Sequence, residues 1–387
     1  MHPIRRLLCM VIISIIHPMP ALAVSTVVCP RDPMVESGKV DVLQKICEAK
    51  KLLKSRQAKW TISTTQSKQM VCKGKGKKRK CQEKLVTKKF RERTILLASL
   101  SLETQVITMV EVPEKLNTKV NGYQVQRLSR DGVDSEFEIT APPGQIVLAL
   151  QFPLKVKSAK GLVLERAVYV PYSREMTAKF PEIIARGRGY LAASIAAARL
   201  KIDAGGANLY TISDELVASL IMVEHFSREV VPNDEVEDEI TKVLFTIGAN
   251  GDEAYRYSVS GAGARGVAQM MPKTYRSLNK RYPKLLMADF YAGTANVPNA
   301  MVSQFLLAAE DLKFLFSQRG WDELRAEGFK HDARRMGAYL SVAYNGGAPR
   351  AARWEDSGQV LPLPAESAKY VVKFHQVWNK RSKFFRK

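Results

Sequence analysis

The pattern of the sequence changes near residue 172, and this change constrains the fold more than any other feature. Residues 95–172 contain short runs rich in β-branched residues that alternate with polar ones, which is typical of strands. Pro142-Pro143-Gly144 and residues 158–161 separate these runs as turns. After Pro171 the apolar residues recur at helical spacing. The pattern predicts an α+β multidomain fold, in which a small β-rich domain precedes a mainly α C-terminal domain.

The 387 residues are enough for two or three domains, each with its own core. We predict a leader at 1–23, a basic cysteine-containing module at 24–94, a β-rich domain at 95–172 and a helical domain at 173–387. The predicted strands cover residues 106–112, 136–140, 145–152 and 162–170, and the predicted helices cover residues 40–53, 180–202, 213–226, 301–316, 336–347 and 368–378.

The first residues resemble a secretory signal peptide. Arg5-Arg6 precede an apolar run at residues 7–16, which is too short to span a bilayer, and Ala21-Leu22-Ala23 supplies small residues for cleavage after Ala23. We therefore expect an exported, periplasmic protein that is free or peripheral to the membrane or cell wall. Cleavage leaves an even number of cysteines, which favours two disulfides. Short loops close readily, and the favoured pairs are Cys29 with Cys47 and Cys72 with Cys81.

A strongly basic tract runs from about Lys50 to Arg93, and its densest part is Lys73–Lys80. The whole chain carries a formal charge of +22, so anionic surfaces are its expected partners. In an envelope compartment, Lys73–Lys80 would contact an anionic surface; the alternative is a solvated loop that only aids solubility. Lys73–Lys80 contains no interleaved aromatic residue, and the expected export argues against nucleic acid, so nucleic acid is not an expected partner.

A glycine-dense run at residues 260–274 carries the clearest functional pattern. Its glycines, among them Gly266, allow a tight turn and a close approach of the backbone to a ligand. Gln269 supplies an amide that both donates and accepts hydrogen bonds, which suits a sugar hydroxyl or an N-acetyl group. Met271 offers an apolar contact for a sugar face. A surface turn without function would carry similar glycines.

Glu224 falls on the apolar stripe of the helix predicted at residues 213–226, four residues after Leu220. A carboxyl on an apolar face is desolvated, which raises its pKa and favours the protonated form that a general acid needs. Alternatively, Glu224 turns to water at the helix end. Glu253 is the rival acid, but it follows a polar turn. His225 is expected to face solvent, because no metal-ligand spacing surrounds it.

Four stretches in this order resemble the motifs of soluble lytic transglycosylases of the goose-type-lysozyme-like superfamily. They are the helix predicted at 213–226 that carries Glu224, the run at 260–274, the Ala-Tyr-Asn-Gly element at 343–346, and residues 363–371. The resemblance covers roughly residues 212–374 and implies a lysozyme-like fold for the C-terminal domain. The chain departs from the family where His225 replaces the usual Ser and where residues 227–259 intervene. We interpret this insertion as an extra helix and loop beside the cleft, or as a solvated acidic helix.

The resemblance also implies residue roles. Glu224 would act first as acid and then as base. Ser260 and Gln269 would contact the sugar or its N-acetyl group, and Gly266 would let the backbone approach it. Met271 would line the subsite. Tyr344 would place its hydroxyl near Glu224, and Asn345 would hold the loop. The aromatic residues near the motif are further cleft candidates, although side chains at such density are more often core; they are Tyr255, Tyr257, Tyr275, Tyr282 and Tyr291.

The implied reaction cleaves the bond between N-acetylmuramic acid and N-acetylglucosamine in peptidoglycan and leaves a 1,6-anhydro sugar. It needs no second carboxylate, and no cofactor or metal is expected. Peptidoglycan glycan strands are the implied substrate, and an envelope-spanning machine is a candidate protein partner. Two alternatives remain: a non-catalytic wall-binding or assembly protein with a degenerate lysozyme-like domain, and a hydrolase that admits water.

Overall fold

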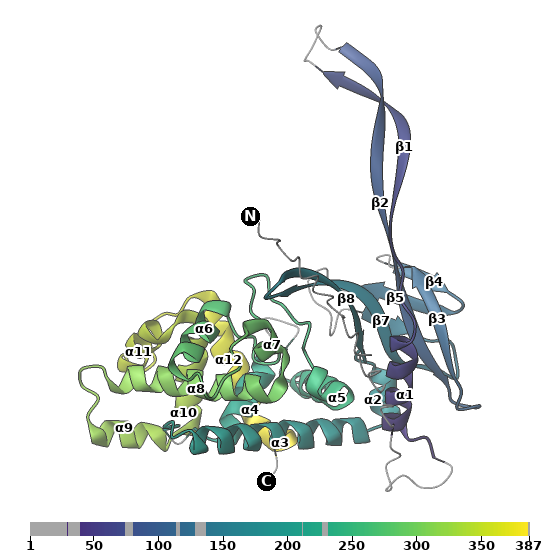
Figure 1. The fold of residues 1–387 in the computed structure, drawn as a ribbon. Coiled ribbons are helices and arrows are strands. Elements are labelled where there is room, and N and C mark those ends of the chain that lie inside the picture. The colour runs from purple at the N-terminus through teal and green to yellow at the C-terminus, as the bar shows by residue number, and fades with distance from the viewer. Residues whose placement is uncertain are drawn as a thin grey trace, which may run out of the picture.

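The computed structural model describes residues 29, 39–73, 80–113, 117–127, 137–210, 212–226 and 231–385. After the helix α1 (Val42–Lys54), antiparallel strands run from Trp60 to Tyr169, and helices follow from Arg174 onward (Figure 1). This confirms the predicted order of a β-rich region followed by a mainly helical region. The predicted leader, residues 1–23, lies outside the described residues. Within them, no helix is both long enough and apolar enough to cross a bilayer.

The main sheet has the order β3–β2–β7–β8, with every neighbouring pair antiparallel. A smaller antiparallel sheet has the order β4–β5–β6. All four strands predicted from the sequence are present, as β3, β6, β7 and β8. The strands are β1 (Trp60–Lys73), β2 (Lys80–Ser101), β3 (Ile107–Pro113), β4 (Asn117–Val120), β5 (Tyr123–Arg127), β6 (Phe137–Thr140), β7 (Gln145–Ser158) and β8 (Gly161–Tyr169).

The central part of the main sheet is buried on both faces, and this explains why β2 is apolar at consecutive positions. Ile95 and Leu97 point into a core shared with the smaller sheet. Leu96 and Leu100 point the opposite way, into the core shared with the helices. Because successive side chains of a strand alternate between faces, a sheet covered on both sides needs apolar residues at every position. The sheet therefore joins the two regions through a common core.

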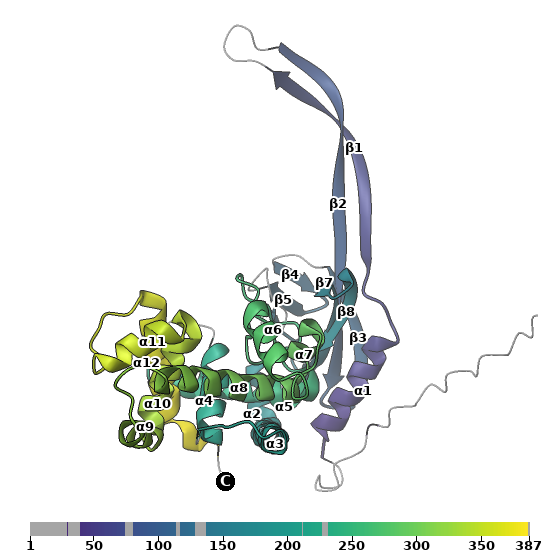
Figure 2. The same ribbon diagram turned by 60° about the vertical axis from the view of Figure 1, so that its left-hand side comes forward.

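The first two strands form a long two-stranded ribbon, which we define as β1 together with the part of β2 from Lys80 to Arg93 that pairs with it. Its outer part projects away from the rest of the molecule (Figures 1 and 2). At its base, the Arg93 guanidinium lies 4.2 Å from the centre of the Trp60 ring. The boundary predicted between residues 94 and 95 falls inside β2, so a continuous strand links the basic segment to the main sheet.

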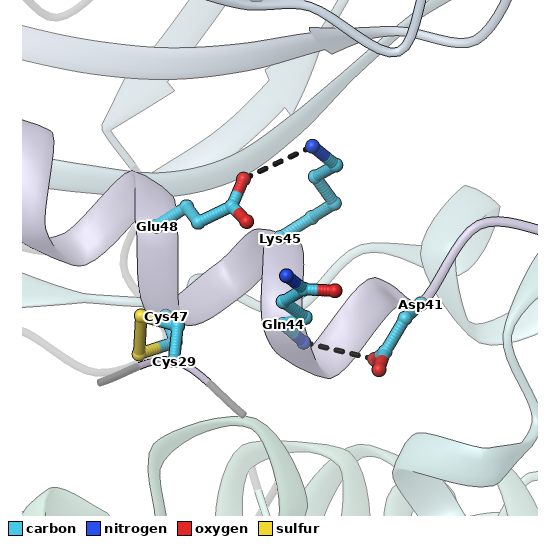
Figure 3. The surroundings of a disulfide bond; sticks show 6 residues. All are labelled: Cys29, Asp41, Gln44, Lys45, Cys47 and Glu48. Carbon is cyan, nitrogen blue, oxygen red and sulfur yellow. Dashed lines mark hydrogen bonds and ion pairs between the residues drawn. A yellow bond between two sulfur atoms is a disulfide. The ribbon is translucent and has the colours of Figure 1, made fainter. Parts of the chain in front are cut away.

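The helix α1 (Val42–Lys54) matches the helix predicted at residues 40–53 and packs on β7. The Asp41 carboxylate accepts a hydrogen bond from the Gln44 main-chain N–H at 2.9 Å, as a helix N-cap does (Figure 3). The disulfide Cys29–Cys47 attaches the preceding segment to this helix, which confirms the first predicted pair. Disulfides are typical of oxidising compartments.

The second predicted pair lies near the tip of the ribbon. Cys72 is disulfide-bonded, and Cys81 lies opposite it in the backbone register. The structure does not describe the Cys81 side chain, so the pairing of Cys72 with Cys81 stays a prediction. Residues 74–79 of the basic segment Lys73–Lys80 also lie outside the described residues.

The helical region contains each helix predicted after residue 172. The bounds are α2 (Arg174–Lys179), α3 (Glu182–Ala204), α4 (Asp214–Glu224), α5 (Val236–Asn250), η2 (Gly251–Glu253), α6 (Pro272–Arg281), α7 (Phe290–Ala295), α8 (Val297–Phe316), α9 (Glu323–Lys330), α10 (Ala333–Gly346), α11 (Ala348–Asp356), α12 (Ala365–Asn379) and η3 (Arg381–Lys383).

The insertion at residues 227–259 supplies α5, which is part of the core. Gly187 of α3 and Gly248 of α5 let the two helices touch: a Cβ atom on either glycine would lie 2.0 Å from a carbonyl oxygen of the other helix. At the C-terminus of α5, Asn250 accepts a hydrogen bond from the Val170 N–H at 2.8 Å and donates one to its carbonyl at 3.0 Å. The extra helix was predicted, and α5 joins the helical region to the sheet; the alternative of a solvated helix is wrong.

Candidate active site

The helix α4 positions Glu224 as its last residue. Ser213 caps the N-terminus by accepting a hydrogen bond from the Leu216 N–H at 3.2 Å, and acidic residues fill the first turn. Every residue from Leu216 to Val223 is buried, while Glu224 keeps partial exposure. Desolvation raises the pKa of Glu224 well above its usual range, and the charge of Lys373 opposes this rise. The desolvated carboxyl predicted from the sequence is therefore present.

Lys373 is a site residue that the sequence reasoning missed. It lies on α12, which packs against α4, and its ammonium group is close enough to act electrostatically on Glu224. Lys373 comes two residues after the end of the last motif. It could have been identified by following the predicted helix at 368–378 beyond that motif. A cation near a desolvated acid stabilises the carboxylate formed when the acid gives up its proton.

The glycine-dense run folds into a tight turn beside α7. The Ser260 N–H donates to the Ala264 carbonyl at 2.9 Å, and the Ser260 hydroxyl accepts from the Ala264 N–H at 3.0 Å. Gly266 has a φ of +74°, and a Cβ atom there would lie 1.9 Å from the Thr294 carbonyl oxygen. Its missing side chain thus serves a close approach to α7. Ser260 is half-buried, and contact of either residue with a sugar stays a prediction.

Gln269 is turned into the protein. Its side-chain amide donates to the Gly266 carbonyl at 2.7 Å and to the Ser258 hydroxyl at 3.1 Å, and only 8% of the residue is exposed. These bonds close the turn in which Gln269 itself takes a positive φ of 43°. The direct role seen in this structure is therefore to hold the turn. The sugar contact predicted for Gln269 stays a prediction.

Tyr344, at the C-terminal end of α10, connects the turn to Glu224. Its hydroxyl lies within hydrogen-bond distance of two main-chain carbonyls, those of Ala268 and Gln269, the latter at 2.7 Å. Desolvation raises the pKa of Tyr344 well above its usual range, and the nearby charge of Glu224 adds to the rise. The structure thus brings Tyr344 close to Glu224. The adjacent Asn345 is exposed, and its side-chain oxygen accepts a hydrogen bond from the Ser367 hydroxyl at 3.2 Å, which holds the start of α12.

The prediction for His225 is wrong. The imidazole does not face solvent: it stacks on the Tyr255 ring, with the ring centres 3.5 Å apart. Its Nε2 lies 2.6 Å from the Val267 carbonyl, which only accepts, so Nε2 carries the hydrogen. Burial lowers the pKa of His225 to about 4, and the bond to Val267 opposes this change. A neutral His225 therefore fixes the end of α4 to the turn.

The remaining predicted residues lie in different settings. Met271 precedes α6 and is 39% exposed, so its side chain is accessible for an apolar contact with a ligand. The rival acid Glu253 lies in η2, where its carboxylate is 3.9 Å from the Lys54 ammonium. Of the tyrosine candidates, three are core residues, with 5% exposure or less, while the other two are partly exposed; the core residues are Tyr255, Tyr257 and Tyr275.

Two further polar groups near Tyr344 were not predicted. The Tyr370 ring of α12 stacks against the Tyr344 ring, with centres 6.1 Å apart, and its buried hydroxyl has no hydrogen-bond partner among the described residues. Asp311 of α8 acts electrostatically on Tyr344, and desolvation raises the pKa of Asp311 to about 7. Asp311 and the adjacent Glu310 interrupt the mostly apolar segment 301–316, which is the signal that could have identified Asp311.

Together these contacts gather three motifs around one carboxyl. The end of α4 touches the turn through His225 and Val267, and the end of α10 touches it through Tyr344. A desolvated carboxyl beside a cation can give up a proton and take one back. No group of three metal-binding side chains is found among the described residues.

The comparisons give this chain no relative: no family model, no curated protein and no solved structure matches it.

Proposed function

We propose that the protein is a peptidoglycan lytic transglycosylase with a lysozyme-like helical domain and with Glu224 as its acid and base. The observation that carries the proposal is the protonated state favoured for Glu224 by its buried surroundings, next to the turn held by Tyr344 and His225. The four motifs in family order support it. An even number of cysteines outside the leader, with one disulfide formed, agrees with an exported protein.

In the proposed reaction Glu224 donates its proton to the glycosidic oxygen that leaves from C1 of the N-acetylmuramyl ring. The C1–O bond breaks, and the C6 hydroxyl of the same ring attacks C1. The carboxylate of Glu224 accepts the C6 hydroxyl proton, so the acid is regenerated and no water is consumed. Attack within one ring benefits from a high effective molarity. Lys373 would stabilise Glu224 in its charged intermediate state.

The experiment is product analysis on purified sacculi. The protein should release 1,6-anhydro-muropeptides that mass spectrometry distinguishes from reducing-end products. Glu224→Gln should abolish release while sacculus binding persists, because the amide keeps the shape of the side chain without its proton.

Glu253→Gln is the matched control, since Glu253 pairs with Lys54, and it should keep full activity. Loss of activity in the Glu253 variant alone would transfer the acid role to that residue. Reducing-end products would mean a hydrolase, and binding without any release would mean a non-catalytic wall-binding protein.

We also propose that the ribbon docks the protein on an anionic envelope surface. Basic side chains, Lys68 and Lys84 among the described ones, are exposed along its outer part, and its projection from the body leaves them accessible (Figure 2). Attraction between a basic ribbon and anionic groups requires no specific pocket.

A further inference from the structure

A groove of about 460 Å³ lies where the sheet region meets the glycine-dense turn. One wall is the hairpin of β7 and β8, represented by Lys155, Lys157 and Leu162. The opposite wall is the turn at residues 259–263, together with Arg265 and, from α7, Tyr291. The hairpin wall lies outside residues 212–374 and so outside the lysozyme-like resemblance, whereas the turn and Arg265 lie within that range.

Arg265 is the unusual residue of this groove. Only 8% of it is exposed. The guanidinium carbon lies 5.3 Å from the centre of the Tyr291 ring. Among the described residues its side-chain nitrogens have no hydrogen-bond acceptor and no carboxylate partner. Desolvation lowers the pKa of the Arg265 guanidinium, as expected for a buried cation without a counter-ion.

A largely buried guanidinium without a partner is costly, because the charge loses part of its water and gains no counter-ion. Proteins usually pair such groups, and the chain does so nearby: Glu165 receives hydrogen bonds from Arg256 at 3.0 Å and from the Tyr257 hydroxyl at 2.6 Å. Glu165 is thus engaged with those two residues. No acidic residue lines the groove among the described residues. An anionic ligand would supply the missing partner of Arg265.

The surroundings favour an anion attached to a larger, partly apolar molecule over a free ion. Lys155 and Lys157 are exposed on β7 and add positive charge to the same groove. Leu162 is 66% exposed and offers an apolar contact at its edge. Ser260 lines this groove and belongs to the same glycine-dense run that contacts His225 and Tyr344 through Val267 and Gln269. A sugar held at the turn would therefore bring its substituents toward Arg265.

We propose that this groove is a second subsite, in which Arg265 binds a carboxylate carried by the muramyl substituent of the glycan. The inference rests on the proposed function, and it assigns the β7–β8 hairpin a part in recognising the substrate. A planar guanidinium matches a carboxylate with two parallel hydrogen bonds.

The test is calorimetric binding to the full chain carrying Glu224→Gln, so that no turnover occurs. One probe is the disaccharide N-acetylglucosaminyl-N-acetylmuramyl-L-alanyl-D-isoglutamine; the other is di-N-acetylchitobiose, which has no carboxylate. Arg265→Met keeps the side-chain length and should weaken binding of the first probe about tenfold or more, in line with the loss of a charge-assisted hydrogen bond. It should leave chitobiose binding unchanged.

Arg276→Met is the matched control, since Arg276 is exposed on α6 and lies outside the groove; it should change neither affinity. Arg265→Lys keeps the charge and should retain part of the affinity. The melting temperature without ligand should stay the same or rise in Arg265→Met, because an unpaired buried charge is removed.

A fall in the melting temperature of Arg265→Met, or equal weakening of both probes, would make Arg265 a structural residue and overturn the inference. Competition by inorganic phosphate as strong as that by the disaccharide would also overturn it, because the groove would then select any anion. The two proposals can fail separately. If no anhydro product is released from sacculi but binding depends on Arg265, only the proposed reaction is refuted. If anhydro product is released but binding does not depend on Arg265, only the subsite is refuted.

Discussion

The Tyr344 hydroxyl lies 2.7 Å from the main-chain carbonyl oxygen of Gln269, and this contact fixes the end of α10 to the glycine-dense turn. The same hydroxyl also reaches the Ala268 carbonyl. Because a hydroxyl has one hydrogen, it donates to one carbonyl at a time. The geometry of the turn beside Glu224 therefore depends on a single phenol.

Tyr344→Phe should lower the free energy of unfolding by about 1–2 kcal/mol, since the single hydrogen bond that the hydroxyl donates to these buried carbonyls is lost. Tyr370→Phe is the matched control, because its buried hydroxyl has no partner in the described part of the chain; its removal should be neutral or stabilising. Urea denaturation of both variants measures the difference. Equal destabilisation by the two changes would refute the role given to the Tyr344 hydroxyl.

Gly266→Ala should destabilise the protein by roughly 2–5 kcal/mol, because the new methyl group meets the Thr294 carbonyl and the backbone keeps a positive φ. Gly263→Ala in the same turn also has a positive φ, but no atom lies within 4 Å of its Cβ position. It should therefore lose only about 1–2 kcal/mol. Thermal unfolding followed by circular dichroism tests the pair, and similar losses would argue against the close contact with α7.

Glu224→Gln should stabilise the protein in a pH-dependent way. The pKa of Glu224 is higher in the folded than in the unfolded state, so folding is favoured at low pH, where both states are protonated. That advantage is lost as the pH rises through the folded pKa. Wild type and variant should thus unfold at the same temperature below the unfolded pKa, about 4.3, and the variant should be more stable at alkaline pH. A constant difference at all pH values would contradict the buried setting.

Asp311→Asn should also stabilise the protein as the pH rises, and here the pH range of the effect is known. The carboxyl has a pKa of about 7 in the folded protein against a usual 3.8, so its ionisation costs stability as the pH rises from about 4 to 7. The variant should equal wild type at pH 4 and exceed it above pH 7 by a few kcal/mol at most, since one pKa unit is about 1.4 kcal/mol. Denaturation midpoints across this pH range are the measurement, and identical curves would place Asp311 in water.

Replacing the six cations of Lys73–Lys80 with Gln should weaken binding to anionic lipid vesicles and remove its salt dependence. The control replaces six exposed cations elsewhere and keeps the same net charge. If both variants lose equal affinity, total charge and not the ribbon governs docking. The control positions are Lys179, Arg188, Lys201, Lys280, Lys284 and Arg319.

The spacing of apolar residues predicted most of the helices and strands, because in these elements the spacing is regular. The helices α3, α4, α8, α10 and α12 each bury one or more apolar faces, and the strands β7 and β8 follow turns with Pro or Gly. The ribbon was not predicted. Its many Lys and Arg residues obscure the alternation of apolar and polar residues that marks a strand, and its two strands pair with each other without packing on a core. Propensity alone therefore gives a weak signal there.

The site was predicted only in part. Glu224 and Tyr344 could be found because they stand in motifs. His225 was placed in water because its partner, the Val267 carbonyl, is a main-chain atom forty-two positions away that no side-chain pattern marks. Lys373, Asp311 and Arg265 matter through burial and through neighbours on other elements, and a linear sequence carries neither.

The ribbon also sets a length. Strands rise about 3.3 Å per residue, so the fourteen residues of β1 give it a reach of roughly 45 Å. A protein anchored by the tip would hold its helices at that height above the anchoring layer. Shortening both strands by equal numbers of residues would bring the helices closer to that layer by about 3.3 Å per residue removed from each strand. The length of the ribbon would therefore set the distance between the anchoring layer and the helical region.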